Sequence, residues 1–244
     1  MAVERYLDEL VAAAREVLGE RLVGAYVGGS YALGAYAQGR SDLDVALVVA
    51  DRLAAEDKEQ LVRALRHESL PCPARGLELV VYRRDAAASP DVAADFELNL
   101  NTGSEMAFRV DVEPDPNETH WFALDRAILR DHAIARDGPP ATDVFGSIPR
   151  PLLLGVLADA LRWHTGGEAK ADDTVLNAVR ALRYAETGTW ASKPDAGAWA
   201  LEHRAERELV AAALAARGGG GAVDPEAARA FAVKALAELE ATRP

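Results

Sequence analysis

Residues 26–30 read Tyr-Val-Gly-Gly-Ser and residues 40–45 read Arg-Ser-Asp-Leu-Asp-Val, and the rest of the chain is organised around these two stretches. An apolar run at 22–27 ends in the glycines, and a second apolar run follows at 43–49. Short apolar runs beside turn residues are typical of buried strands. We therefore expect two strands, separated by a Gly-Gly-Ser turn and a short helical segment at 31–36.

The second strand carries a pair of acids at its start. Strand side chains alternate faces, so Asp42 and Asp44 point to the same side. Neighbouring carboxylates raise the cost of ionising each other, and a hard cation such as Mg²⁺ removes that cost through oxygen ligands. The glycines allow the backbone to approach a phosphate closely. This stretch alone predicts a site for a metal and a triphosphate.

Composition and charge narrow the class of protein. The chain has 244 residues, enough for one large domain or two smaller ones. Half of the residues are apolar and 27% are charged, as in an ordinary soluble globular protein. The formal net charge of −12 argues against a nucleic-acid partner bound through a basic surface and is compatible with a cationic small molecule.

Cysteine use and hydropathy indicate the compartment. Cys72 is the only cysteine of the sequence, so no internal disulfide is possible and a reducing compartment fits. Residues 1–18 alternate charged and apolar side chains, which predicts an amphipathic helix rather than a signal peptide. No apolar run approaches the roughly 20 residues of a membrane span. We expect a cytoplasmic monomer without membrane or nucleic-acid partners.

The remainder of the first half predicts helices at 3–18 and 56–69, and a strand at 77–82. Glu78 is a lone acid within that strand. A buried unpaired carboxylate is costly, so Glu78 either joins the aspartates at the metal site or faces solvent on an edge strand. Both readings stay open. Residues 85–118 predict a long, partly irregular connection with one strand at 97–101, and a helix follows at 120–135.

The second half is helical throughout, with candidates at 152–164, 174–186, 194–217 and 225–241. Mixed elements followed by helices alone indicate two segregated lobes. The expected fold class is α+β: a nucleotide-binding domain at 1–115, with a small mixed sheet flanked by helices, followed by an all-helical domain at 116–244.

The Gly-Gly-Ser turn followed by Asp42-Leu43-Asp44 resembles the signature of the polymerase-beta-type nucleotidyltransferase superfamily. The helical half is similar to that of the streptomycin/spectinomycin adenylyltransferases, and smaller matches lie near Glu78, Trp121 and Asp125. The stretches that carry the helical similarity are 175–180 (Val-Leu-Asn-Ala-Val-Arg), 186–188, 192–193 and 199–200. The resemblance implies transfer of AMP from ATP, with Mg²⁺, to a hydroxyl of an aminoglycoside or aminocyclitol antibiotic, which confers resistance.

The resemblance also implies roles for individual residues. Asp42 and Asp44 would ligate Mg²⁺, and Glu78 would take the proton from the acceptor hydroxyl. The remaining implied contacts are with the triphosphate, through Gly29, Ser30, Ser41, Arg180 and Lys193, and with the cationic groups of the drug, through Asp172 and Asp173.

The sequence departs from the family at the acceptor side. Family members that accept streptomycin tend to have a tryptophan shortly before the acidic position, and residues 166–171 contain none. An aromatic residue is also missing from 99–106. Spectinomycin is therefore favoured over streptomycin. Two alternatives stay open: a nucleotidyltransferase acting on another acceptor (a protein, an RNA or a metabolite), and a catalytically idle nucleotide-binding module.

Overall fold

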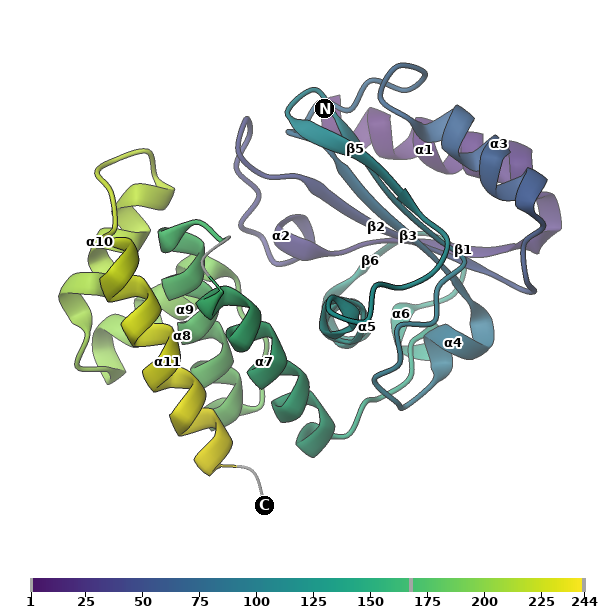
Figure 1. The fold of residues 1–244 in the computed structure, drawn as a ribbon. Coiled ribbons are helices and arrows are strands. Elements are labelled where there is room, and N and C mark those ends of the chain that lie inside the picture. The colour runs from purple at the N-terminus through teal and green to yellow at the C-terminus, as the bar shows by residue number, and fades with distance from the viewer. Residues whose placement is uncertain (1, 167–168, 243–244) are drawn as a thin grey trace. The chain divides into compact units, whose positions relative to one another are not determined.

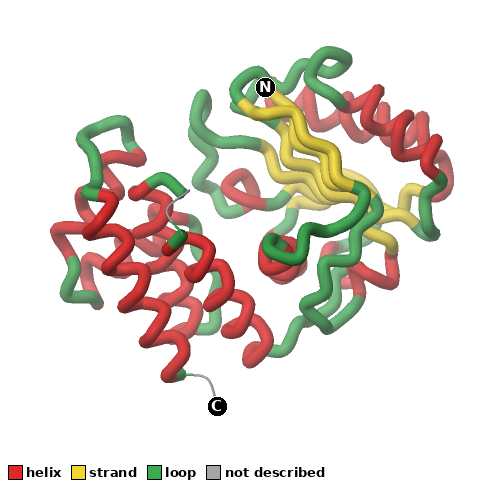
Figure 2. The backbone as a smooth tube through the Cα atoms, viewed as in Figure 1, coloured by secondary structure: helices red, strands yellow, loops and turns green. Residues whose placement is uncertain are grey.

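The computed structural model describes residues 2–166 and 169–242. These residues form two compact units, Met1–Ile148 and Pro149–Pro244. All strands of the described chain belong to the first unit, and the second is built from helices (Figure 2). The predicted α+β class, a mixed sheet with helices followed by a helical part, is confirmed.

The first unit contains a six-stranded mixed sheet (Figure 1). The strands lie in the order β5-β4-β3-β2-β1-β6. Strands β2 and β3 are parallel, and every other neighbouring pair is antiparallel. The bounds are β1 Leu22–Val27, β2 Leu43–Val49, β3 Leu77–Arg83, β4 Leu98–Gly103, β5 Met106–Asp111 and β6 Ile134–Asp137. The two strands around the glycine turn have the bounds predicted from sequence.

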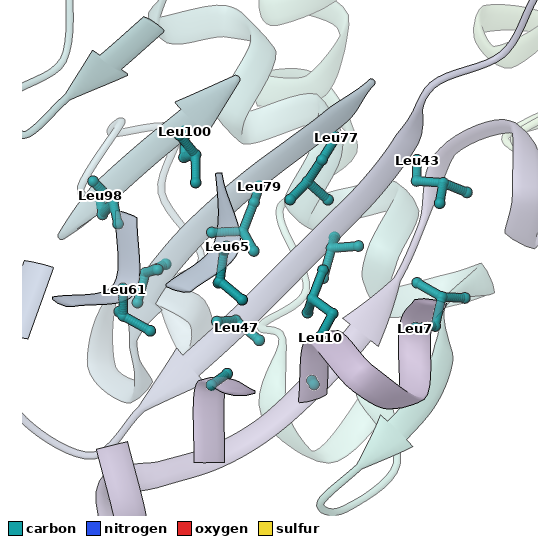
Figure 3. Packing of buried hydrophobic residues seen from close by; sticks show 14 of the residues in the cluster. Leu7, Leu10, Leu43, Leu47, Leu61, Leu65, Leu77, Leu79, Leu98 and Leu100 are labelled. Carbon is teal, nitrogen blue, oxygen red and sulfur yellow. The ribbon is translucent and has the colours of Figure 1, made fainter. Parts of the chain in front are cut away.

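Helices α1 (Ala2–Leu18) and α3 (Ala55–Leu65) cover one face of the sheet (Figure 1). The core on this face is rich in leucine, and Figure 3 shows Leu10 of α1, Leu47 of β2 and Leu61 of α3 among its members. All three side chains are fully buried. Burial of one such side chain stabilises the fold by roughly 1.5–3 kcal/mol relative to exposure, so this face anchors the strands firmly.

The opposite face packs against α5 (Thr119–His132) and the segment after α6 (Ala141–Val144). Tyr26 of β1 meets Phe145 edge to face, with ring centroids 5.2 Å apart. Because strand side chains alternate, Asp44 shares this face with Ala46, and Glu78 shares it with Tyr82. Both acids therefore lie on the α5 side of the sheet.

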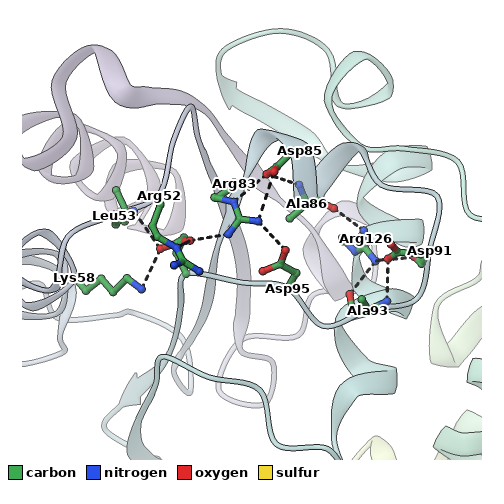
Figure 4. A network of polar contacts seen from close by, with 11 residues as sticks. Arg52, Leu53, Lys58, Arg83, Asp85, Ala86, Asp91, Ala93, Asp95 and Arg126 are labelled. Atoms are coloured by element: carbon green, nitrogen blue, oxygen red, sulfur yellow. Dashed lines mark hydrogen bonds and ion pairs between the residues drawn. The ribbon is translucent and has the colours of Figure 1, made fainter.

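The chain between α4 (Arg84–Ala88) and β4 is held by one buried side chain, Arg126 of α5 (Figure 4). Its guanidinium donates hydrogen bonds to four backbone carbonyls, those of Ala86, Ser89, Asp91 and Ala93, at 2.6–3.2 Å. The stretch predicted as partly irregular, 85–118, thus contains most of a short helix, two strands and a pinned loop.

The sequence placed a domain boundary between residues 115 and 116, whereas the structure divides after Ile148. The difference arises from β6, which pairs with β1 through Tyr26 and Ala135. That pairing ties the chain after α5 to the sheet, so α5, β6 and α6 belong to the first unit.

The second unit consists of α7 (Arg150–Thr165), α8 (Ala171–Thr187), α9 (Lys193–His203), α10 (Arg207–Arg217) and α11 (Pro225–Ala241). Helix α8 contacts each of the other four. The single helix predicted at 194–217 is two helices, α9 and α10, which also pack against each other. Within 2–166 and 169–242, no helix is long and apolar enough to cross a membrane.

Candidate active site

The three predicted catalytic acids lie at adjacent positions on β2 and β3. Asp44 of β2 pairs directly with Glu78 of β3 in the parallel register. Asp42 lies two residues before Asp44, just ahead of the strand. Strand β3 is flanked by β2 and β4, so the alternative in which Glu78 faces solvent from an edge strand is wrong.

The glycine turn packs directly onto Asp44. The N–H of Gly28 donates to the backbone carbonyl of Asp44 at 2.9 Å. Gly29 has a φ of +55°, and a Cβ atom at this position would lie 1.7 Å from Oδ2 of Asp44. Positive φ favours glycine, and here the missing side chain also makes room for the carboxylate. The turn and the acid pair therefore form one packed structure.

The two serines of the site differ in their surroundings. Ser30 lies in the short helix α2 (Gly29–Ala32), and its Oγ is buried without a hydrogen-bond partner among the described residues. Buried hydroxyls normally have partners, so this group suits a bound polar ligand. Ser41 is itself buried, and its Oγ accepts a hydrogen bond from the N–H of Ala37 at 3.1 Å. Ser41 therefore closes the turn that leads into the acidic strand.

Charge is concentrated around Glu78. Burial raises the pKa of this carboxyl well above its ordinary value, and the charges of Asp44, Asp42 and Asp125 act in the same direction. Arg75 opposes them, and its guanidinium donates to Oδ2 of Asp42 at 2.8 Å. A cation bound beside these carboxylates would lower the cost of ionising Glu78.

The acidic side chains of the site have the oxygen ligands that Mg²⁺ prefers. Among residues 2–166 and 169–242, no group of three or more His, Cys, Asp and Glu side chains could by itself hold a metal ion. Mg²⁺ in nucleotide sites commonly takes one or two carboxylates, with phosphates and water as its other ligands. The oxygen-only pair Asp42 and Asp44, beside a glycine turn, fits that pattern.

Two residues near Glu78 received no role from the sequence. Arg75 pairs with Asp42 and acts on Glu78, and Asp125 of α5 also acts on Glu78. Asp125 is an exposed acid between the buried Leu124 and Arg126. In the sequence, Asp125 interrupts the mainly apolar stretch 121–129, and this interruption could have marked it as a candidate site residue. The pairing of Arg75 had no such signal, because it depends on how the chain folds.

The residues predicted in the helical half all lie in the second unit. Lys193 begins α9, and its Nζ donates to Oδ1 of Asp173 in the first turn of α8 at 2.6 Å. Arg180 of α8 donates to the carbonyl of Ala191 at 2.9 Å. Asp172 is buried, with 9% of its surface exposed. Residues 167 and 168, in the segment without tryptophan, lie outside the described residues.

Comparison with solved structures identifies the fold. The chain matches the crystal structure of spectinomycin adenyltransferase AAD(9) from Enterococcus faecialis, determined with ATP and spectinomycin, with a TM-score of 0.71. The match covers 98% of this chain and 99% of that one, at 15% sequence identity. This likeness shows the fold, which is that of a nucleotidyltransferase with a helical C-terminal part.

The second half of the chain matches a family model. Residues 143–242 match the aminoglycoside adenylyltransferase C-terminal domain. The match covers 100 of the 244 residues, and the resemblance seen in the sequence is confirmed. No curated protein matches the sequence.

Proposed function

We propose that the protein transfers AMP from Mg²⁺-bound ATP to a hydroxyl group of spectinomycin and thereby confers resistance. The observation that carries the proposal is the packing of the Gly28–Gly29 turn against Asp44, with Asp44 in register with Glu78. The family match at 143–242 supports an antibiotic acceptor, and the structure similar to this chain contains ATP and spectinomycin.

The reaction is an in-line displacement at the α-phosphorus. The acceptor oxygen forms the new bond to that phosphorus, the bond to the oxygen bridging toward the β-phosphorus breaks, and pyrophosphate leaves. The acceptor proton goes to the carboxylate of Glu78. Bound Mg²⁺ would offset the charge on the phosphate oxygens. Asp42 and Asp44 would hold the cation, and Ser30 would donate to a phosphate oxygen.

Further residues of both units are proposed to contact the triphosphate and the acceptor. The turn at Gly29 and the hydroxyl of Ser41 would border the triphosphate, and Arg180 and Lys193 would contact its phosphates from the second unit. Asp172 is proposed for the cationic groups of the acceptor. Because residues 166–171 lack a tryptophan, spectinomycin is preferred to streptomycin as the acceptor.

The test is a pyrophosphate-release assay with Mg-ATP against spectinomycin, streptomycin and a panel of other aminoglycosides. Mass spectrometry of the acceptor should show the addition of AMP to spectinomycin. Silence across the panel, with ATP binding intact, would reject an antibiotic acceptor.

The matched variants are Asp44→Asn and Asp51→Asn. Asp44→Asn removes a proposed metal ligand and should lower turnover by at least 100-fold, in line with the usual cost of losing one electrostatic contributor to the transition state. Asp51 is exposed just beyond the other end of the same strand, so Asp51→Asn should leave turnover unchanged. Equal activity of both variants would remove Asp44 from the mechanism.

A further inference from the structure

The short helix α2, which follows the glycine turn, is tied to α1 by one acid, Glu4. The hydroxyl of Tyr31, in α2, donates a hydrogen bond to Oε1 of Glu4, in the first turn of α1. The other oxygen of the same carboxylate, Oε2, accepts a hydrogen bond from Arg136 of β6. Glu4 thus joins three elements of the first unit: α1, α2 and β6.

Helix α2 depends on such contacts for its position. It has four residues, about one turn, and a helix that short is not stable in isolation. Residues 33–42 form neither helix nor strand, and Gly34 and Gly39 in this stretch have positive φ. Contacts with β2 and α5 also restrain α2, so the bond from Tyr31 to Glu4 is a further attachment.

Tyr31 directly follows Ser30, the proposed phosphate contact. Successive residues of a helix point about 100° apart. The Oγ of Ser30 is therefore directed elsewhere than the Tyr31 side chain, and it is buried without a hydrogen-bond partner among the described residues. Because both side chains belong to one helical turn, a rotation of α2 moves them together. The bond at Tyr31 therefore limits where the Ser30 hydroxyl can point.

We propose that Glu4 is a positioning residue of the phosphate site: through Tyr31 it holds α2, and with it Ser30, in the orientation that meets a phosphate oxygen of ATP. This inference rests on the proposed function, because it takes the contact of Ser30 with the triphosphate from there. Without Glu4, part of the binding free energy of the nucleotide would be spent on ordering α2, and the affinity for ATP would fall.

A simpler role for Glu4 is that of an acid in the first turn of a helix, paired with a nearby arginine. Asp8 of the same helix separates the two roles, because it also accepts a hydrogen bond from Arg136. The single hydroxyl hydrogen of Tyr31 goes to Glu4. Loss of either acid should affect stability through Arg136, whereas only loss of Glu4 should affect nucleotide affinity.

The experiment is calorimetric titration of the full chain with Mg-ATP, without an acceptor. Tyr31→Phe and Glu4→Ala should each weaken binding by about 5-fold, a moderate loss because 48% of the Glu4 side chain is exposed. The double variant should bind no more weakly than either single one, since both changes remove the same bond. Glu4→Gln keeps an acceptor oxygen for Tyr31 and should retain most of the affinity. Asp8→Ala, the matched control, should bind Mg-ATP like the unaltered protein.

A second readout needs no nucleotide. The N–H groups of Ala32 and Leu33 donate to the carbonyls of Gly28 and Gly29 at 3.1 Å. Their hydrogen exchange should become faster in Tyr31→Phe and Glu4→Ala, and stay unchanged in Asp8→Ala.

Three results would each overturn the proposal: unaltered ATP affinity in Tyr31→Phe and Glu4→Ala, equal weakening by Asp8→Ala, or hydrogen exchange in α2 that does not respond to the loss of Glu4. Failure of the unaltered protein to bind Mg-ATP would reject the proposed function instead. The titrations omit the acceptor, so they can succeed even where every antibiotic in the turnover assay fails.

Discussion

Gly29 shows how one residue without a side chain can determine a site. It begins α2 with a positive φ, and its missing Cβ leaves the space that the Asp44 carboxylate occupies. The conformational requirement and the steric one can be separated, because Gly34 shares the first without the second: its φ is +68°, and a Cβ there would meet nothing within 4 Å.

Gly29→Ala should therefore abolish turnover, whereas Gly34→Ala should only destabilise the protein. A left-handed conformation costs a residue with a Cβ about 1–2 kcal/mol, and both variants should lose that much in urea denaturation. Only Gly29→Ala should also displace the carboxylate at position 44. Turnover retained by a folded Gly29→Ala variant would show that the Asp44 position tolerates movement.

Glu78→Gln tests the proposed base. The amide keeps the size of the side chain but cannot take a proton, so turnover should fall by about 100-fold or more while ATP affinity stays close to that of the wild type. Glu16→Gln, at an exposed position on α1, serves as the control. If Glu78→Gln turns over normally, the proton goes elsewhere.

At the scale of the elements, Glu97 joins the start of β4 to neighbouring segments. Its carboxylate is buried, accepts from the N–H of Leu53 at 3.1 Å and from Arg83 at 3.2 Å, and pairs with Lys58 at 3.0 Å. Burial acts to raise the pKa of Glu97, but the bonds from Lys58, Leu53 and Arg83 outweigh it, so the pKa lies below its ordinary value. The ionised form therefore stabilises the fold.

Glu97→Gln should destabilise the protein by about 3 kcal/mol near neutral pH, since it breaks a buried ion pair. A lowered pKa gives stability that is present above the ordinary glutamate value of about 4.3 and is lost as pH falls through the lower folded value. The difference between variant and wild type should shrink below that range. Urea denaturation near neutral pH and below the folded pKa measures this difference in the free energy of unfolding, with the exposed Glu59→Gln as control. A difference that does not change with pH would contradict the role of Glu97.

Sequence patterns predicted the strands that are buried on one or both faces of the sheet. They missed the strands at the two edges of the sheet. Strands β1 and β2 are buried along most of their length and were predicted at their true bounds. Strand β5 is mostly exposed, and the four-residue β6 is at the other edge of the sheet. Neither has the alternation of buried and exposed residues that marks a strand in sequence. The break between α9 and α10 also lacks glycine and proline.

The candidate site likewise contains some features that the sequence predicted and others that it did not. The common face of Asp42 and Asp44 was predictable because strand periodicity and the turn beside them limit where they point. The position of Glu78 was left open, because the sequence does not show which strands lie at the edge of the sheet. The pairing of Asp42 with Arg75, and that of Asp173 with Lys193 and Arg217, join segments far apart in sequence. No periodicity encodes such contacts; they follow from the packing of whole elements.

For the whole molecule, the proposed nucleotide contacts are divided between two compact units. Asp42, Asp44 and Ser30 belong to the first, and Arg180 and Lys193 belong to the second. The acceptor contact proposed for Asp172 also lies in the second unit, so nucleotide binding and acceptor binding are expected to be coupled.

Mg-ATP, or a non-hydrolysable analogue of it, should therefore raise the affinity for spectinomycin by about 5-fold or more, a modest coupling between two sites. By thermodynamic linkage, spectinomycin should raise the affinity for the analogue by the same factor. Calorimetric titrations in both orders provide the check. Equal spectinomycin affinity with and without nucleotide would show that the two ligands bind independently.

The arrangement around Arg126 has a consequence for proteolysis. The segment between α4 and β4 has no regular structure for most of its length, and such a segment would ordinarily be the first that a protease cuts. A protease must draw several residues into an extended conformation, but the Arg126 guanidinium holds four of the carbonyls in and before this loop. Limited digestion should leave 86–93 intact, and Arg126→Met should make it the preferred point of cleavage.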